Sequence, residues 1–515
     1  MLENKFHDFF ERRASECGNN LCLTDGETGK SYTFESLNRR VNQACNLLLE
    51  LGLNTGDKFA TFMTNSIEFI VMYLASMKVG TLIVPLAVDM PQMKIERMFN
   101  ELKIKIAITD KIRFKPLDAI RNRLNSLQEI FTIKYDNKND LNNALSKMPE
   151  DIDNVSVSTL STPGSLYFSS GTTGTPKGIP QSPKNLLVAA ENLAAAYGFG
   201  VADTQMGILP NYHTALVTYG FWPGFCVGSN FVLFEKFSRT NFWKNIEKYR
   251  VAFVEVVPTI ISMIMNPPED ISKYNISSIK FIGSGSAPLS PDLQRRFEDT
   301  FGVLIANKYG LSETEPTHFN PPQRELRKEG SIGKPLPMCE VRIVKEDGTL
   351  CISNEIGEII MRGENVVSGY YKDSTATADA FRNGWFYTGD LGYFDKDGFY
   401  FLVDRKKDII KRGGAIVFPN EIDQLLLSHP KVVEATAFGV PDEIYGEILK
   451  ACIVLKQGSK VTPDELIEYC RQRLEGYKCP SEVYIIKEIP KTHSGKLLRR
   501  ELKEMFLKGN LNGKN

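Results

Sequence analysis

The chain has 515 residues, of which 42% are hydrophobic and 24% are charged, and these fractions are typical of a folded globular protein and exclude a disordered chain. Lysine plus arginine and aspartate plus glutamate each number 62, so we expect no nucleic-acid partner and no attraction to an anionic membrane. The nine cysteines include no Cys-x-x-Cys pair and the start lacks a signal pattern, so we expect a reducing, cytoplasmic location.

Helical patterns alternate with short apolar runs from residue 35 to about residue 300. The successive pairs of helix and strand are 37–51 with 58–63, 67–79 with 82–85, and 93–102 with 104–108, and further strands are expected at 251–257 and 279–282. This alternation predicts an α/β fold with mostly parallel strands. The most apolar stretch, 251–265, contains Glu255 and Pro258 and is shorter than the roughly 20 residues that span a bilayer, so no membrane span is expected.

The pattern changes beyond about residue 330 to strands separated by glycines, at 340–344, 357–362 and 398–403, which predict a β-rich, barrel-like subdomain. A charged run at 404–408 follows, and we place a domain boundary there. Residues 1–403 then form a large N-terminal domain and 404–515 a small α+β domain. The elements expected in the small domain are helix 421–427, strands 432–439 and 449–455, helix 463–474 and strand 482–487.

A run of small and hydroxylated residues follows the apolar strand at 166–168. The run reads Ser169, Ser170, Gly171, Thr172, Thr173, Gly174, Thr175, Pro176, Lys177, Gly178. Glycines let backbone N–H groups converge on an anion, hydroxyls add donors, and Lys177 adds charge, so the run predicts a phosphate-binding loop. The usual P-loop has Gly-Lys-Ser/Thr, whereas Lys177 is preceded by proline and followed by glycine, which disfavours a kinase or GTPase.

Together with four later motifs, this loop resembles the adenylate-forming (ANL) superfamily of acyl- and aryl-CoA synthetases, nonribosomal-peptide adenylation domains and beetle luciferases, and most of all the acyl-CoA synthetases. The other motifs are Tyr309-Gly310-Leu311-Ser312-Glu313, Tyr387-Thr388-Gly389-Asp390, Asp404-Arg405-Lys406-Lys407-Asp408 and Pro490-Lys491-Thr492-His493-Ser494-Gly495-Lys496. The resemblance implies an ATP-dependent carboxylic acid–CoA ligase. It would form an acyl-adenylate with release of pyrophosphate, and then an acyl-CoA thioester with release of AMP.

The resemblance also implies which residues bind the nucleotide. They are Ser169, Ser170, Gly171, Thr172, Thr173, Gly174, Lys177, Ser284, Gly285, Ser286, Ala287, Tyr309, Gly310, Ser312, Asp390 and Arg405. Tyr309 would stack on adenine, Asp390 would accept hydrogen bonds from the ribose hydroxyls, and Arg405 would contact the ribose. From local sequence alone, Tyr309 would be a core aromatic and Asp390 an exposed turn residue.

Catalysis is expected to depend on Lys496, because joining a carboxylate to an α-phosphate brings two anions together and needs a cation between them. Judged by its neighbours alone, Lys496 would be a solvated lysine of a basic tail. Thr173 and Glu313 are the implied Mg²⁺ ligands. Asp404 is the implied hinge of a mobile C-terminal domain. The segment Lys411, Gly413 and Gly414 would line the passage for the pantetheine arm of coenzyme A.

The implied pocket for the acid contains His213, Val256, Pro258, Gly285, Lys308 and Thr314. His213 is assigned to substrate placement or gating and not to acid–base catalysis. Many acyl- and aryl-CoA ligases of the superfamily have Gln-Gly before the motif tyrosine, and the glycine opens the acyl pocket. Asn307-Lys308 takes that place here, so Lys308 argues against a long acyl tunnel and favours a short or polar acid.

Three other functions keep the same motifs. A free-standing adenylation enzyme would load a small-molecule carboxylic acid onto the phosphopantetheine of a carrier protein supplied in trans. A luciferase-like oxygenase would consume oxygen and emit light. A non-catalytic nucleotide-binding relative usually lacks the terminal lysine, which is present here as Lys496.

Overall fold

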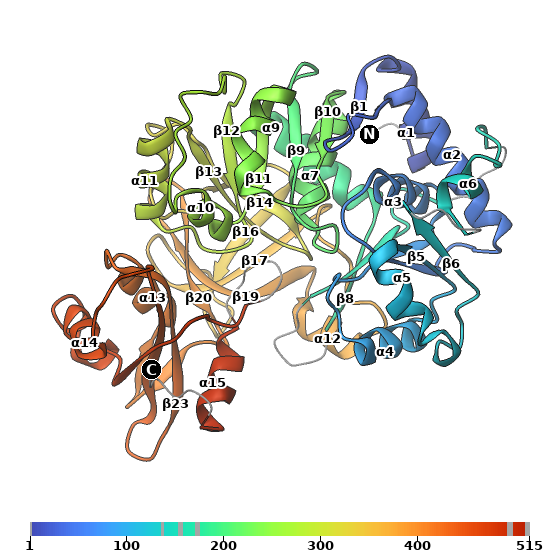
Figure 1. The fold of residues 1–515 in the computed structure, drawn as a ribbon. Coiled ribbons are helices and arrows are strands. Elements are labelled where there is room, and N and C mark those ends of the chain that lie inside the picture. The colour runs from blue at the N-terminus through green and yellow to red at the C-terminus, as the bar shows by residue number, and fades with distance from the viewer. Residues whose placement is uncertain (1–2, 135–138, 153–157, 170–175, 492–497, 510–515) are drawn as a thin grey trace.

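The fold is known from a computed structural model that describes residues 3–134, 139–152, 158–169, 176–491 and 498–509. Its strands form four sheets, two of them large and mostly parallel, one antiparallel, and one C-terminal. In Figure 1 the C-terminal elements lie together at the lower left and the first helices lie at the far right. The predicted α/β class with a barrel-like subdomain and a small C-terminal unit is confirmed.

The six-stranded sheet contains the first predicted helix–strand pairs. Its strands, in spatial order, are β6 (Glu129–Ile133), β5 (Ile106–Asp110), β3 (Lys58–Phe62), β4 (Leu82–Pro85), β7 (Ser165–Phe168) and β8 (Gly178–Gln181). All neighbours are parallel except β7 and β8, which are antiparallel. The strand expected from residue 104 begins only at Ile106, because the preceding helix ends on Lys103 in the left-handed conformation (φ 55°) and Ile104 N then donates to Phe99 O.

The nine-stranded sheet positions most of the predicted site. Its strands, in spatial order, are β15 (Lys334–Pro335), β14 (Glu315–Asn320), β13 (Ile305–Leu311), β12 (Phe281–Ser284), β11 (Val251–Val256), β9 (Thr204–Gly207), β10 (Asn230–Leu233), β1 (Leu21–Asp25) and β2 (Ser31–Thr33). Parallel pairing aligns Glu255 of β11 with Gly283 of β12, and Ser284 with Asn307 of β13. The carboxyl ends of these three strands therefore meet at one edge, where α/β sheets bind ligands.

Helices cover the two large sheets. They are α1 (Phe6–Glu16), α2 (Phe34–Glu50), α3 (Ile67–Val79), α4 (Gln92–Leu102), α5 (Lys111–Asp118), α6 (Leu141–Leu145), α7 (Pro183–Tyr197), α8 (Trp222–Val227), α9 (Phe242–Tyr249), α10 (Pro258–Ile264) and α11 (Pro291–Phe301), with a π-helix at Val217–Phe221. The start of α7 is fixed by its sequence, because the Ser182 side chain accepts from Asn185 N and Pro183 occupies the first turn.

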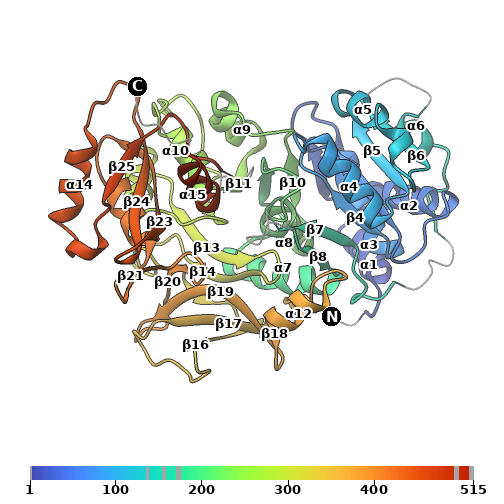
Figure 2. The same ribbon diagram turned by 90° about the horizontal axis from the view of Figure 1, so that it is seen from below.

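The antiparallel sheet lies beneath β13 and β14 in Figure 2. It contains β16 (Cys339–Val344), β17 (Gly357–Gly363), β19 (Trp385–Phe394) and β18 (Phe381–Arg382), with β20 (Tyr400–Arg405) paired to β19 and α12 (Ser374–Ala380) beside it. Tyr309 of β13 and Tyr400 of β20 belong to the same apolar cluster, so this sheet packs directly against the strand that carries the second motif.

The C-terminal sheet has its own apolar core, which includes Ile410, Val417, Ile422 and Leu449. Its elements are β22 (Ala415–Val417), β21 (Ile410–Arg412), β24 (Gly446–Leu455), β23 (Val432–Asp442) and β25 (Glu482–Ile485), with helices α13 (Pro419–Leu427), α14 (Pro463–Arg471) and α15 (Arg499–Leu507). Two strands are longer than expected because β23 and β24 pair along their whole length as a hairpin. Within the described ranges, no helix combines the length and the hydropathy that a membrane crossing requires.

Candidate active site

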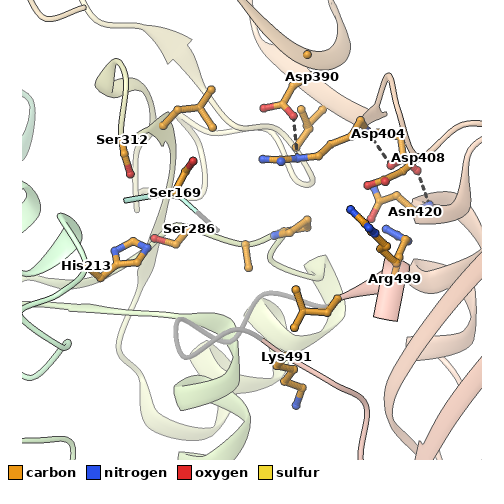
Figure 3. A pocket seen from close by; sticks show the side chains of 18 of the residues that line it. Ser169, His213, Ser286, Ser312, Asp390, Asp404, Asp408, Asn420, Lys491 and Arg499 are labelled. Atoms are coloured by element: carbon orange, nitrogen blue, oxygen red, sulfur yellow. Dashed lines mark hydrogen bonds and ion pairs between the residues drawn. The ribbon is translucent and has the colours of Figure 1, made fainter. Parts of the chain in front are cut away.

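A cleft of about 1650 Å³ opens at the carboxyl ends of β11, β12 and β13 and is closed on its other side by C-terminal residues. Many of the predicted site residues line this cleft, and they come from the first four of the five motifs and from the segments between them. They are Ser169, Lys177, His213, Pro258, Ser286, Ala287, Lys308, Tyr309, Gly310, Ser312, Glu313, Asp390, Asp404 and Arg405. Figure 3 shows His213, Ser286, Ser169 and Ser312 on one side of this space and Asp390, Asp404 and Arg499 on the other.

Other predicted residues lie elsewhere. Val256, Ser284 and Thr314 are fully buried, and Gly285 lies next to the cleft-lining Ser286. Gly413 and Gly414 have positive φ (56° and 85°) and form the turn between β21 and β22, outside the residues that line the cleft. The predicted residues Ser170, Gly171, Thr172, Thr173, Gly174 and Lys496 lie outside the described part of the chain.

Three polar side chains from three strands meet at Asp390. Tyr309 OH donates to Asp390 Oδ2 at 2.7 Å, and Arg405 Nε lies 3.2 Å from Asp390 Oδ1. Asp390 and Arg405 are register partners on β19 and β20, which fixes their separation. Burial, followed by the charge of Asp390, raises the pKa of Tyr309, so its hydroxyl remains a donor. Because each carboxylate oxygen has two lone pairs, Asp390 can still accept bonds from a ligand in the cleft.

The base of the glycine-rich loop is closed by a backbone bond from Ser169 N to Lys177 O of 3.0 Å, which extends the β7–β8 ladder. Lys177 Nζ lies 4.5 Å from the ring centre of Tyr370. Tyr370 OH also donates to Glu313 Oε1 at 3.0 Å. Tyr370 thus joins the loop lysine to the motif carboxylate, and no sequence pattern used above pointed to it.

Glu313 fits a divalent cation. Burial raises the pKa of its carboxyl, and a buried carboxylate of this kind is stabilised by a cation. Among the described residues, no group of three or more histidine, cysteine, aspartate or glutamate side chains could hold a metal ion by itself. A single carboxylate at the cleft suits Mg²⁺, because this ion keeps few protein ligands and takes the rest from phosphate and water.

His213 lies beside Ser286 at the wall of the cleft (Figure 3). Its Nδ1 accepts a bond from Ala215 N at 3.2 Å, so in the neutral ring the proton is on Nε2. We call the part of the cleft lined by His213, Tyr219, Ser286 and Lys308 the inner pocket.

A buried ion pair lies at the inner pocket. Lys308 Nζ pairs with Glu255 Oε2 and donates to Tyr197 OH at 2.9 Å. The rings of Tyr219 and Phe253 lie 4.6 and 4.7 Å from the same nitrogen. We call Glu255 and Lys308 the pocket pair.

Burial acts on both members of the pocket pair. It raises the pKa of Glu255 to about 7 and lowers the pKa of Lys308 to about 8, while the mutual attraction of the two groups opposes both shifts. Gly283 lies between them on β12, and a Cβ there would overlap both charged groups. The sequence alone did not point to Glu255 as a pocket residue. Its one available signal was a charge inside an otherwise apolar strand.

Asp404 joins the two parts of the molecule. Its Oδ1 accepts from Arg405 N and its Oδ2 from Asn420 N, both at 2.7 Å, so it caps the start of α13 from the end of β20. Burial raises the pKa of Asp404. Arg499 pairs with Asp423 of α13 and donates to Ala437 O at 3.1 Å, which fixes α15 to the C-terminal sheet.

Similar proteins are known over almost the whole length of the chain. Residues 10–371 match the family model described as AMP-binding enzyme, and residues 421–496 match the AMP-binding enzyme C-terminal domain. The chain is 32% identical to the oxalate–CoA ligase of Arabidopsis thaliana over 98% of both chains. It is 33% identical to the long-chain-fatty-acid–CoA ligase of Bacillus subtilis over 92% of this chain and 90% of that one. Its fold superposes on ATP-bound MatB from Rhodopseudomonas palustris with a TM-score of 0.90 at 26% identity, covering 99% of this chain and 100% of that one.

Proposed function

The chain belongs to the AMP-binding enzyme family, and from this premise we propose how its cleft performs the work of an AMP-forming acid–CoA ligase. In the first half-reaction a carboxylate attacks the α-phosphate of ATP and pyrophosphate leaves. In the second, the thiol of coenzyme A attacks the acyl-adenylate and AMP leaves. One observation carries the proposal: the Tyr309–Asp390–Arg405 cluster and the base of the glycine-rich loop line the same cleft.

The nucleotide would lie across the sheet edge. Asp390 accepts hydrogen bonds from the ribose hydroxyls, with Arg405 beside it, and adenine packs between Tyr309 and the segment from Ser284 to Ala287. Gly310 and Ser312 complete this wall. The triphosphate is bound by loop residues 169–177, whose backbone N–H groups and hydroxyls suit an anion.

Magnesium would be held by Glu313 and Thr173 together with phosphate oxygens. When bound, the ion neutralises part of the phosphate charge. The role of Glu313 is supported by its buried carboxyl and its contact with Tyr370, which itself stacks under the loop lysine Lys177.

Lys496 would approach the carboxylate and the α-phosphate during adenylation. The domain of residues 404–515 would then turn about Asp404 and bring Lys411, Gly413 and Gly414 to the passage for pantetheine. Because the curated relatives named above are CoA ligases, the proposed acceptor is coenzyme A and not a carrier protein.

Those relatives are named for oxalate, the smallest diacid, and for long-chain fatty acids. The acid used by this chain must therefore be sought in its own pocket. His213, Pro258 and Lys308 line the cleft, whereas Val256, Gly285 and Thr314 are buried residues close in the chain to residues that line it.

The test is acid-dependent exchange of labelled pyrophosphate into ATP, followed by release of AMP when coenzyme A is added. We expect exchange without coenzyme A for at least one acid, and thioester formation only with coenzyme A. An Asp347→Asn variant, altered in an exposed turn outside the residues that line the cleft, serves as the matched control and is expected to retain both activities. Absence of exchange with every acid in a panel of short, aromatic, long-chain and amino acids would contradict the proposal.

A further inference from the structure

Lys308 of the pocket pair directly precedes Tyr309 of the predicted nucleotide site on β13. Successive residues of a strand point to opposite faces, so Tyr309 faces Asp390 while Lys308 faces the other side of β13. A Cβ placed on Gly285 would lie 3.2 Å from Glu255 Oε1 and 3.4 Å from Tyr219 OH. The free oxygen of the pair is therefore directed at Gly285, beside the cleft-lining Ser286.

The space behind the pair is filled. The side chain of Lys308 is fully buried and that of Glu255 is 6% exposed. Aromatic rings pack behind them, with Tyr197 and Phe253 centred 5.0 Å apart and Phe253 and Phe281 centred 5.2 Å apart. A chain of many carbons could pass this point only by displacing a buried ion pair, and a buried pair whose partners are separated leaves uncompensated charges.

The pair also offers unused hydrogen-bonding capacity. A lysine ammonium carries three donors, and the bonds of Lys308 Nζ described above go to Glu255 and Tyr197. Glu255 Oε1 is buried and has no hydrogen-bond partner among the residues that the structure describes. An alkyl end lying over Gly285 would leave both groups unsatisfied, which is costly in a buried site. A polar end with an oxygen atom accepts from the ammonium, and a hydroxyl also donates to Oε1.

We propose that Glu255 and Lys308 form the floor of the acid site and restrict the enzyme to short acids that carry an oxygen-bearing polar group at the far end. This inference rests on the proposed function. It assigns Glu255 and Lys308 as specificity-determining residues that contact the acid and not the nucleotide.

The test compares kcat/KM for acid-dependent pyrophosphate exchange with 3-hydroxypropionate, malonate, butyrate and octanoate. For the unchanged enzyme we expect kcat/KM for one of the two polar acids to be at least about tenfold higher than for butyrate, because butyrate leaves a buried hydrogen bond unmade. We expect it to be at least about 100-fold higher than for octanoate, because octanoate would also displace the buried ion pair. Comparison of 3-hydroxypropionate with malonate separates a hydroxyl end from a second carboxylate.

Two double variants separate the effect of the volume of the Glu255 and Lys308 side chains from the effect of their polarity. Glu255→Ala with Lys308→Gly empties the floor, and we expect exchange with octanoate to rise at least about tenfold. Glu255→Met with Lys308→Met approximately keeps the volume and removes both charges and their hydrogen-bonding groups, so it should lose the preference for polar acids while still rejecting octanoate. The matched control is Glu11→Met with Lys78→Met, an ion pair between a partly exposed glutamate and a fully buried lysine outside the residues that line the cleft, which should leave the order of acids unchanged.

Each variant is first checked for thermal unfolding and for binding of ATP. Octanoate equal to or better than the polar acids in the unchanged enzyme overturns the inference while leaving the ligase proposal intact. The inference is also overturned, with the ligase proposal intact, if the variant Glu255→Ala with Lys308→Gly folds and binds ATP but keeps the original order of acids. If that variant does not fold, the volume-preserving variant decides, because a retained preference for polar acids overturns the inference. Failure of every acid in the unchanged enzyme overturns both proposals.

Discussion

The Asp390 carboxylate is oriented by two protein neighbours, Tyr309 and Arg405. One carboxylate oxygen accepts from Tyr309 and the other faces Arg405, so the orientation of the carboxylate is fixed by β13 and β20 and not by the ligand. A carboxylate held in this way would lose less entropy on binding the proposed ribose, and its negative charge would strengthen the hydrogen bonds that it accepts.

Replacing Asp390 by asparagine should therefore weaken ATP binding. The amide keeps the shape but removes the charge and turns one acceptor into a donor that faces Arg405. We expect the KM for ATP in pyrophosphate exchange to rise about 10- to 100-fold, the loss typical of a hydrogen bond to a charged group. The exposed Asp347→Asn variant is the control. An unchanged KM for ATP in the Asp390→Asn enzyme would show that this carboxylate does not bind the nucleotide.

At the scale of single residues, the sequence predicts the site residues that lie within motifs. It does not predict the distant residues that contact them. Tyr309, Asp390 and Arg405 stand in recognisable strings, and the structure brings them into contact. Glu255 and Tyr370 stand in no such string, and each acts through a residue more than 50 positions away, Lys308 and Glu313 respectively. Contacts of that kind depend on how strands are ordered in a sheet, which local spacing does not encode.

At the scale of elements, β14 carries a histidine against the motif strand. His318 pairs in register with Tyr309, and its ring lies 4.9 Å from that of Tyr400. Its Nδ1 lies 3.0 Å from Thr317 Oγ1. Burial lowers the pKa of His318 to about 3, so the ring stays neutral in the folded protein under ordinary conditions.

This burial predicts a loss of stability in mild acid. The folded pKa lies below the ordinary value of 6.5, so the unfolded chain takes up the proton first. The contribution of His318 to the free energy of unfolding is fully present above pH 6.5 and is lost as the pH falls from there toward 3. The loss at pH 5 is about 2 kcal/mol. Urea unfolding at pH 7.5 and pH 5 should show a smaller drop for His318→Gln than for the unchanged protein. Equal drops in the two proteins would rule out this source of acid sensitivity.

The helices and parallel strands expected from apolar periodicity are present, and their ends are where the prediction differs. The strand expected at 449–455 begins at Gly446, and the one expected at 432–439 continues to Asp442. Polar residues at a hairpin tip carry no apolar signal, although the backbone there is still paired. Pairing between strands, and not periodicity, decides such boundaries.

At the scale of the whole molecule, the first 400 residues and the C-terminal sheet have separate cores and meet at Asp404. Its carboxylate bridges β20 and α13, so rotation about this residue has to break or rearrange the bond to Asn420 N. The domain boundary at 404 stays a prediction, and so does the alternation of Lys496 and Gly414 at one cleft.

That alternation can be tested by separating the half-reactions. Lys496→Ala should abolish pyrophosphate exchange but spare thioester formation from supplied acyl-adenylate. Gly414→Trp should do the reverse, slowing thioester formation at least about tenfold because the indole would obstruct a narrow thiol passage and β-carbons are disfavoured at φ 85°. Gly458→Trp is the matched control, a glycine of the same domain with φ 78° and open surroundings. Equal loss of both half-reactions in either active-site variant would refute the division of roles.

Gly283 has a consequence for how this protein can diversify. Any side chain at this position would collide with both Glu255 and Lys308, so positions 255, 283 and 308, on three adjacent strands, are epistatic. Removing either charge alone leaves the other buried without its partner, and a side chain at position 283 alone forces both charged ends to move. Single substitutions at these positions are therefore expected to be costly, and a library intended to shift the acid accepted should randomise the three codons together.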